Sequence, residues 1–194
     1  MTGLLGGAFD PPHNGHVALA DAALVRFALA RLVVVVTGTP PHKRVGTDAE
    51  TRFRLAEAAF GGRPRVELSR HELERPGPSY TVDTARWAEA QWGDVVFLVG
   101  ADEFAAFLRW RQPDDVLAHV RLGVATRPGY PREELEPVLA GLARPERVDF
   151  FEIPEIPISS REVRRRVAGA EPIDGLVPER VGELIAELRL YDGC

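Results

Sequence analysis

Two histidines, His13 and His16, stand three residues apart directly after the glycine-rich segment Gly6-Gly7-Ala8-Phe9-Asp10-Pro11-Pro12. A short apolar run precedes this segment and a helical pattern follows it, so we expect a strand, a turn and a helix. Residues three apart on a helix share a face, which lets both imidazoles contact one bound group. The N–H groups and the positive dipole at a helix N-terminus attract phosphate, and glycines allow a ligand to approach the backbone. The segment therefore predicts a site for a nucleotide phosphate.

Metal ligation is the alternative for this histidine pair. Zinc normally takes three or four protein ligands, and the single cysteine of the chain is Cys194, at its far end. Phosphate contact is therefore favoured over metal ligation, and no residue is predicted to be a metal ligand.

A basic loop, Pro40-Pro41-His42-Lys43-Arg44, follows the second expected strand. The two prolines stiffen the loop and present the basic side chains outward. A phosphate dianion needs more than one donor, and this loop offers three. A solvated charged turn is the alternative interpretation.

Polar and aromatic residues follow two later elements. Ser79 is expected to cap a helix that begins near Thr81. Asp102 follows Gly100 at the expected end of a strand, where a carboxylate can accept hydrogen bonds from ribose hydroxyls, although helix capping is the alternative. Trp110 lies between two arginines, so we expect it to be partly exposed, with a face that can stack on a pyridine ring.

The last candidate is the segment Ile158-Ser159-Ser160, which begins a short predicted helix. Its backbone N–H groups and serine hydroxyls can hold phosphates, and Arg164 lies one turn further on. The arginine-rich stretch 161–166 is, in isolation, typical of a solvated helix face.

Strand patterns alternate with helical patterns along the 194 residues. This alternation predicts an α/β fold: a Rossmann-like, doubly wound, mainly parallel sheet with helices on both faces. Ligands of such folds bind beyond the carboxyl ends of the strands. We expect one domain, 1–194, with a small helical C-terminal extension at 170–194. Strands are predicted near residues 4–5 and at 32–37, 65–68, 95–99, 121–126 and 148–153, and helices at 16–30, 50–60, 80–92, 113–119, 132–142, 160–167 and 178–190.

Composition excludes several classes of protein. The formal net charge of −5 argues against nonspecific nucleic-acid binding. The longest apolar-rich window, 17–36, contains Asp21, Arg26 and Arg31, which argues against a membrane span. One cysteine cannot form an internal disulfide, which fits a reducing cytoplasm, and no signal-peptide pattern precedes the first expected strand. The sequence leaves open whether the chain is a homo-oligomer.

The segment from Gly6 to His16 resembles the GGxFDPxHxGH signature of the nucleotidyltransferase superfamily. Within that superfamily the chain most resembles the bacterial nicotinate mononucleotide adenylyltransferases, because further motifs occur in family order over nearly its whole length. These are Pro40-Pro41-His42-Lys43, Pro78-Ser79-Tyr80-Thr81, Gly100-Ala101-Asp102 with Trp110, Arg127-Pro128-Gly129-Tyr130, and Ile158-Ser159-Ser160 with Arg164.

This resemblance implies that the chain joins ATP and nicotinate mononucleotide to give nicotinate adenine dinucleotide and pyrophosphate, in NAD biosynthesis. It implies direct in-line attack of the mononucleotide phosphate on the ATP α-phosphorus, with Mg²⁺ accompanying ATP. The residues implied in catalysis are His13, His16 and Arg164. Those implied in ATP binding are Gly6, Gly7, Phe9, His13, His16, Gly100, Asp102, Ile158, Ser159, Ser160 and Arg164, and those implied in mononucleotide binding are His42, Lys43, Thr81, Trp110 and Arg127.

The chain departs from the family pattern at three places. Thr37-Gly38-Thr39 stands where the family usually has Pro-Asn, and Ala8 and Arg161 stand where it usually has hydroxyl residues. Two alternatives follow. The same fold could serve another acceptor, such as nicotinamide mononucleotide or phosphopantetheine, or the chain could be an inactive nucleotide-binding module. The intact histidine pair and Arg164 favour an enzyme.

Overall fold

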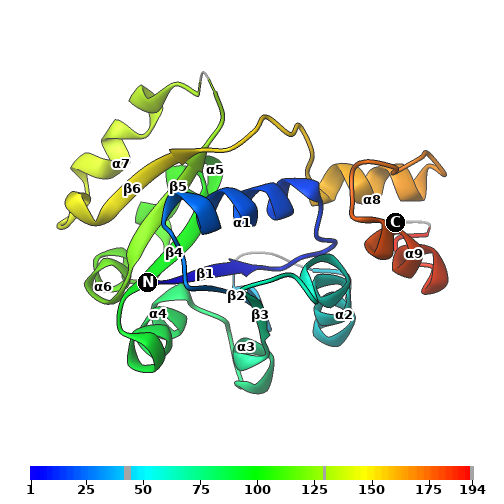
Figure 1. The fold of residues 1–194 in the computed structure, drawn as a ribbon, viewed down its shortest axis with the longest axis horizontal. Coiled ribbons are helices and arrows are strands. Elements are labelled where there is room, and N and C mark those ends of the chain that lie inside the picture. Colours follow the sequence, from blue (N-terminus) through cyan, green and yellow to red (C-terminus); the bar gives the residue numbers. More distant parts are fainter. Residues whose placement is uncertain (42–44, 129, 193–194) are drawn as a thin grey trace.

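Six parallel strands form a single sheet through the middle of the molecule (Figure 1). The structure is a computed structural model and describes residues 1–41, 45–128 and 130–192. From the centre of the sheet, the strands follow in chain order from β1 to β3 on one side and from β4 to β6 on the other, as in doubly wound nucleotide-binding folds. The predicted fold class is therefore confirmed. Across the sheet the strands are β3 (Val66–Ser69), β2 (Arg31–Val36), β1 (Thr2–Gly7), β4 (Val95–Gly100), β5 (Arg121–Thr126) and β6 (Val148–Glu152).

Side chains of each inner strand alternate between two hydrophobic cores, one on each face of the sheet. In β2, Val34 and Val36 belong to one core, and Val33 and Val35 belong to the other. A strand buried on both faces needs a continuous apolar run instead of an alternating one. This explains why the run of valines in β2 was recognisable from the sequence.

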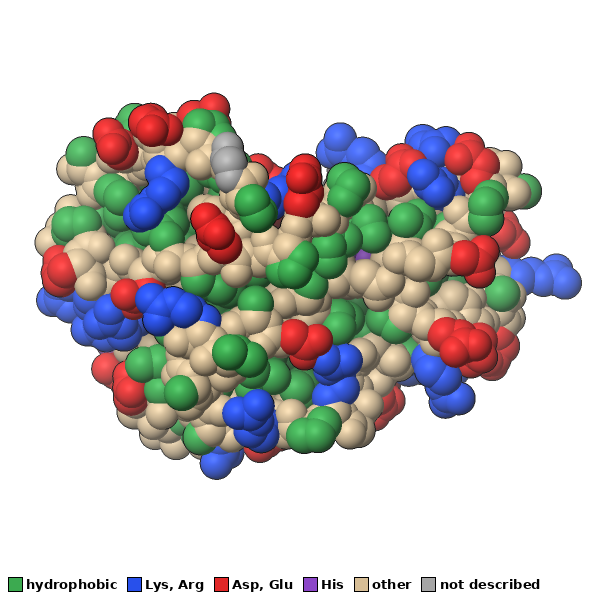
Figure 2. Space-filling model, turned by 45° about the horizontal axis from the view of Figure 1, so that its top comes forward, with side chains coloured by type: hydrophobic (Ala, Val, Ile, Leu, Met, Phe, Trp, Pro, Cys, Tyr) green, Lys and Arg blue, Asp and Glu red, His purple; other side chains and the backbone are tan. Residues whose placement is uncertain are grey.

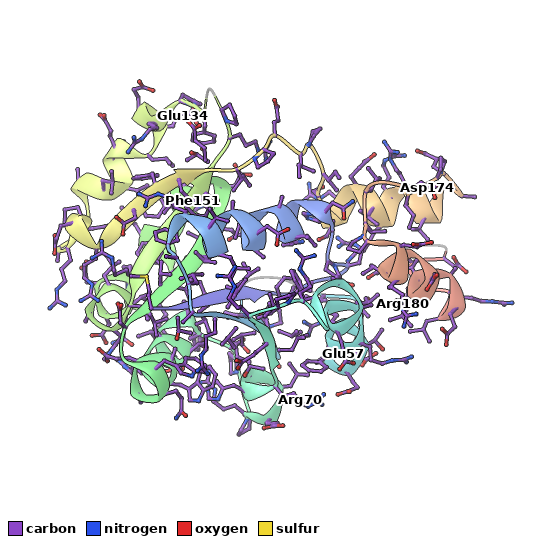
Figure 3. All side chains as sticks on the ribbon, viewed as in Figure 1. Glu57, Arg70, Glu134, Phe151, Asp174 and Arg180 are labelled. Carbon is purple, nitrogen blue, oxygen red and sulfur yellow. The ribbon has the colours of Figure 1, made fainter. Side chains whose placement is uncertain are left out.

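Helices cover both faces of the sheet. α1 (Asn14–Arg26) and α2 (Ala49–Phe60) contribute to one core, and α4 (Thr81–Trp92), α5 (Ala101–Ala105), α6 (Pro113–His119) and α7 (Glu136–Ala140) border the other. Figure 1 shows α1 and α4 on opposite sides of the sheet, with α8 (Ser160–Ala168) and α9 (Glu179–Glu187) beyond the carboxyl ends of the strands. Figure 3 shows side chains filling the space between α1 and the sheet, where Phe151 meets Phe27 at a ring-centroid distance of 5.3 Å.

Most predicted elements are present, with shifted ends. The helix predicted at 16–30 ends at Arg26, and Ala28 has a positive φ of 46° that a helix cannot continue through. The helix predicted at 132–142 is divided into a 3₁₀ turn, Arg132–Glu134, and α7, whose second residue is Pro137. The short helices α3 (His71–Glu74) and α5 were not predicted. Within the described residues, 3₁₀ turns also occur at Phe107–Arg109 and Pro145–Arg147.

The C-terminal segment packs onto the main core. Val181 and Ile185 of α9, and Tyr191 after it, are buried in the same hydrophobic cluster as β1 and α2. The last helix therefore packs against the same hydrophobic core that covers one face of the sheet.

The surface carries charges of both signs. Figure 2 shows Lys and Arg side chains interspersed with Asp and Glu side chains over the face in view. Among the described residues no helix is both long enough and apolar enough to span a bilayer.

Candidate active site

The predicted histidine pair lies at the N-terminus of α1, directly beyond the carboxyl end of β1. His13 is the N-cap residue, with extended backbone angles, and His16 is the third residue of the helix. Phe9, in the connecting turn, has a positive φ of 50° and a side chain that is only 2% exposed. Its ring packs edge-on against the His16 imidazole, with the centroids 5.2 Å apart. A core residue thus fixes the orientation of His16.

A backbone hydrogen bond fixes the tautomer of His16. The His13 backbone N–H donates to His16 Nδ1 over 3.1 Å, so this nitrogen carries no proton. The neutral His16 ring must then be protonated on Nε2, and that N–H is its donor. The two imidazole rings lie with their centroids 3.8 Å apart at an angle of 34°.

His13 is held neutral by its surroundings. Burial lowers the pKa of its imidazole from 6.5 to about 4. Its Nδ1 is buried and has no hydrogen-bond partner among the residues that the structure describes. At neutral pH the His13 ring is therefore uncharged, beside the positive end of the α1 dipole.

Gly7, the last residue of β1, and Gly15, the second residue of α1, make room for protein rings. A Cβ atom on Gly15 would lie 3.0 Å from the His13 ring, and one on Gly7 would lie 2.9 Å from the Phe9 ring. Real Cβ atoms do not approach that closely without a shift of the neighbour. Both glycines therefore permit the observed positions of His13 and Phe9.

Helix α8 closes over the same turn, from about 150 residues further along the chain. The Ser160 hydroxyl donates to the Pro11 carbonyl over 2.9 Å, and Arg164 Nη1 donates to the Asp10 carbonyl over 2.5 Å. Ser159 is the N-cap of α8 and accepts a hydrogen bond from the Glu162 N–H. The structure thus brings Ser159, Ser160 and Arg164 together with the histidine pair.

The arginines of α8 divide into two groups. Arg165 and Arg166 form ion pairs with Glu162, which lower the pKa of its carboxyl to about 2. Arg161 and Arg164 form no ion pair among the described residues. Arg161 is exposed and lies one turn before Arg164. Of the arginines in α8, Arg161 and Arg164 are therefore the two whose guanidinium groups could contact an anion.

Asp10 connects the turn to the C-terminal segment. Its side chain is 5% exposed, and its Oδ1 accepts a 2.7 Å hydrogen bond from the Tyr191 hydroxyl. Burial and this hydrogen bond both raise the pKa of the phenol. Sequence reasoning missed Tyr191, because its partner lies 181 residues away.

Gly38 and Thr39, at the start of the loop after β2, are held by a buried serine side chain. The N–H groups of Gly38 and Thr39 both donate to Ser79 Oγ over 3.2 Å. The prediction that Ser79 caps α4 is therefore wrong, because its side chain binds this loop and Tyr80 is the N-cap residue. His42 and Lys43, predicted to bind the mononucleotide, lie outside the described residues together with Arg44.

A buried carboxylate stands behind this loop. Glu72 is 7% exposed and accepts a 2.6 Å hydrogen bond from the Thr84 hydroxyl, and burial raises the pKa of its carboxyl. A Cβ atom on Gly38 would lie 2.2 Å from the Glu72 carbonyl oxygen. Only glycine allows this close approach of the loop to α3.

Further predicted residues lie at the carboxyl ends of β4, which neighbours β1, and of β5, which neighbours β4. Gly100 ends β4 and is the N-cap residue of α5, which contains Asp102. Arg127, directly after β5, lies 3.8 Å from Asp102. Both side chains are exposed, so this pair contributes little to stability, and its charges remain accessible to solutes.

Trp110 and Thr81 lie at the same edge of the sheet. Trp110 is half-buried and packs edge-on against Phe97 of β4, with the centroids 6.5 Å apart. Thr81 is the first residue of α4, where backbone N–H groups have no partner within the helix. Arg111 lies over the ring of Tyr80, the residue before Thr81, at 4.4 Å.

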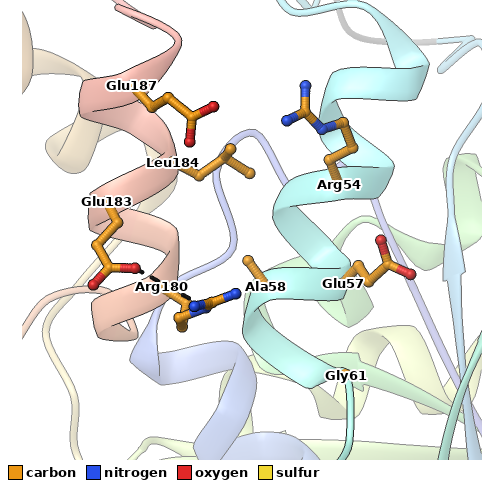
Figure 4. Close-up of a pocket in the computed structure, with 8 residues that line it drawn as sticks. All are labelled: Arg54, Glu57, Ala58, Gly61, Arg180, Glu183, Leu184 and Glu187. Atoms are coloured by element: carbon orange, nitrogen blue, oxygen red, sulfur yellow. Dashed lines mark ion pairs between the residues drawn. The ribbon is translucent and has the colours of Figure 1, made fainter.

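A surface groove of about 510 Å³ lies elsewhere, between α2 and α9. Figures 3 and 4 show Glu57 of α2 and Arg180 of α9 on its two walls. Arg180 also pairs with Glu183 at 4.0 Å, and both side chains are exposed. None of the predicted site residues that the structure describes lines this groove, so it is not the candidate active site.

Comparisons with known proteins agree with this arrangement. The cytidylyltransferase-like family matches residues 4–166. A probable nicotinate-nucleotide adenylyltransferase of Moorella thermoacetica is 40% identical over 97% of this chain and 90% of its own length. One of Thermus thermophilus is 39% identical over 97% of this chain and 98% of its own length.

Solved structures show the same fold. A nicotinic acid mononucleotide adenylyltransferase of Plasmodium falciparum, complexed with NaAD, superimposes with a TM-score of 0.77 at 18% sequence identity. The match covers 100% of this chain and 98% of that one.

Proposed function

The chain belongs to the cytidylyltransferase-like family and, within it, to the nicotinate-nucleotide adenylyltransferases, and from this premise we propose how its residues carry out the reaction. The enzyme transfers the adenylyl group of ATP to nicotinate mononucleotide, giving nicotinate adenine dinucleotide and pyrophosphate, a step of NAD biosynthesis. The observation that carries the assignment of residues is the histidine pair at the N-terminus of α1, closed over by Ser160 and Arg164 of α8.

The reaction needs no nucleophile or general base from the protein. The mononucleotide phosphate is already an anion and attacks the α-phosphorus in line with the leaving pyrophosphate. Catalysis then consists of positioning the two phosphates and stabilising the charge that develops on the leaving group. The proposed contributors are His13, the Nε2–H donor of His16, and the Arg164 guanidinium, which has donors beyond the one bound to Asp10.

ATP lies over the turn after β1 in this proposal. Phe9 is buried, so it would contact the nucleotide only through its backbone. The Ser160 hydroxyl donates its proton to Pro11, so its contact with phosphate is assigned to its backbone N–H. Asp102 accepts hydrogen bonds from the ribose. The full ATP set is Gly6, Gly7, Phe9, His13, His16, Gly100, Asp102, Ile158, Ser159, Ser160 and Arg164.

Nicotinate mononucleotide lies between the loop after β2 and the ends of β4 and β5. Its phosphate is assigned to His42 and Lys43. Trp110 stacks on the pyridine ring, and the N–H groups at the start of α4, near Thr81, face the carboxylate of the ring. Arg127 adds a positive charge at this edge.

Mg²⁺ is proposed to arrive with ATP. The donors of the site are chiefly N–H groups, which suit phosphate oxygens, and the described residues contain no cluster of three or more metal-binding side chains. Triphosphate oxygens and water would therefore hold the ion, which would neutralise phosphate charge. We also propose a cytoplasmic location, where both small-molecule substrates are available.

A direct assay tests the function. The purified chain is incubated with ATP and Mg²⁺ together with either nicotinate mononucleotide, nicotinamide mononucleotide or phosphopantetheine. We expect pyrophosphate release and nicotinate adenine dinucleotide with the first acceptor. Release with another acceptor alone would change the acceptor assignment, and release with none would identify an inactive nucleotide-binding module.

A further inference from the structure

Arg52 of α2 is a buried cation outside the predicted site. It is 2% exposed and is the largest of the fully buried side chains. Burial lowers the pKa of its guanidinium, and the negative charges of Asp10 and Asp48 oppose that effect. The side chain therefore stays charged inside the protein. A charge in this position costs stability unless its surroundings compensate.

The compensation comes from backbone carbonyl groups. Nη1 donates to the carbonyls of Ala8 and Thr37, over 2.9 and 2.6 Å. Nη2 donates to the Gly38 carbonyl over 2.9 Å, and Nε donates to the Thr47 carbonyl over 3.1 Å. No salt bridge to Arg52 is present among the described residues.

These four bonds join two loops that separate beyond the sheet. Ala8 belongs to the turn after β1, and Thr37 and Gly38 begin the loop after β2. The strands themselves stay in register as far as Gly7 and Val36, and one backbone bond, from the Thr37 N–H to the Gly7 carbonyl, follows. Past that point, the Arg52 side chain is hydrogen-bonded to both loops.

The fork of the guanidinium suits this task. Its donors diverge in one plane at fixed angles, so they fix the positions of several carbonyl groups at once. A lysine ammonium is a single point with no such fork. An apolar side chain would fill the space without any hydrogen bond and would leave the carbonyls unsatisfied.

We propose that Arg52 is a positioning residue for adenylyl transfer, which sets the separation between the loop that holds the ATP phosphates and the loop that leads to the mononucleotide phosphate. This inference rests on the proposed function, because that function places one reacting phosphate on each loop. Arg52 touches neither substrate. It acts on the alignment of attacking oxygen and α-phosphorus, which in-line displacement requires.

Two variants and one control test the proposal. Arg52→Ala removes the guanidinium fork. Arg52→Lys keeps the charge and most of the side-chain stem, so it is the variant to assay if Arg52→Ala does not fold. Arg54→Ala is the control, since Arg54 lies on the same helix but is exposed and faces the groove beside α9. Each protein is assayed for kcat, for the KM of ATP and of the mononucleotide, for binding of each substrate alone, and for Tm.

We expect kcat to fall about 10²-fold in both Arg52 variants, the scale of a misalignment near 1 Å. Binding of each substrate alone should change less than about threefold, because each loop still holds its own phosphate. Millimolar guanidinium should restore part of the kcat of Arg52→Ala and leave Arg54→Ala unchanged.

Other results would overturn the proposal. A kcat near that of the wild type in a folded Arg52 variant would remove the positioning role. Weaker binding of both substrates, with a lower Tm and no rescue by guanidinium, would show that Arg52 only stabilises the fold. A wild-type enzyme that forms no dinucleotide would instead overturn the proposed function, and this inference with it.

Discussion

The backbone N–H of His13 donates a 3.1 Å hydrogen bond to Nδ1 of His16, and this bond decides which nitrogen of His16 is the donor. The same bond satisfies one of the N–H groups that a helix N-terminus leaves without a partner. His16 thus has a structural function through Nδ1 and a proposed catalytic function through Nε2. Two substitutions can separate these functions.

His16→Gln places an amide nitrogen near the position of Nε2, and His16→Asn places an amide oxygen near the position of Nδ1. We expect His16→Ala to lower kcat about 10²–10³-fold, the scale of one lost charge-stabilising donor. His16→Gln should keep more of the kcat than His16→Asn, whereas His16→Asn should keep more of the free energy of unfolding. Steady-state kinetics and denaturant unfolding measure the two effects. A folded His16→Ala enzyme with wild-type turnover would exclude the catalytic function.

The neutral state of His13 makes stability depend on pH. Its pKa is about 4 in the folded protein and 6.5 as a free side chain, so the unfolded chain binds a proton in a range where the folded protein does not. The stabilisation is therefore complete above pH 6.5 and is lost as the pH falls from 6.5 to about 4. The loss amounts to about 3 kcal/mol of unfolding free energy.

His13→Asn provides the comparison, because its side chain does not titrate. Other groups with shifted pKa values, such as Glu72, remain in both proteins and cancel in the difference. Urea unfolding of both proteins at several pH values should give a difference that changes over this window. A constant difference would show that the folded His13 titrates as it does in water.

Sequence patterns predicted those features that depend on local spacing. The valine run of β2 identified a strand buried on both faces, and the spacing of His13 and His16 identified the helix start. α3 and α5 were missed because four or five residues are too few to show a helical period.

Contacts between distant residues could not be predicted in this way. The partners of Arg52 are backbone carbonyls, which any residue can supply, so no residue type in the sequence marks them. Ser79 has the residue type of an N-cap, yet its oxygen is satisfied by Gly38 and Thr39, about 40 residues earlier.

Tyr191→Phe should destabilise the protein by about 1–3 kcal/mol, because it removes the hydrogen bond to the buried Asp10 carboxylate. Guanidinium chloride unfolding measures this loss. A double-mutant cycle with Asp10→Asn serves as the control, and a coupling energy near zero would show that the hydrogen bond does not contribute.

The basic loop predicts a selective effect on one substrate. Changing His42 and Lys43 together to Ala should raise the KM for nicotinate mononucleotide much more than the KM for ATP, because only the first phosphate is assigned there. Initial rates with each substrate varied in turn give both constants. An equal rise in the two would mean that the loop acts on the whole site.

The choice between nicotinate and nicotinamide tests the placement of the pyridine ring. In the proposed arrangement, nicotinate presents a carboxylate to the N–H groups near Thr81, whereas nicotinamide turns an NH₂ group toward the same donors. A buried donor left without a partner costs about 1–3 kcal/mol, so two of them predict a preference of about 10²-fold or more in kcat/KM. Trp110→Ala should weaken both substrates and preserve their ratio, because stacking does not distinguish the two rings.

The assignment of this chain as a nicotinate-nucleotide adenylyltransferase is tested most directly by a single ratio. This is the kcat/KM of the wild-type enzyme for nicotinate mononucleotide divided by its kcat/KM for nicotinamide mononucleotide. We expect a ratio of about 10² or more in favour of nicotinate. A ratio near one would contradict it and identify an enzyme that accepts both mononucleotides.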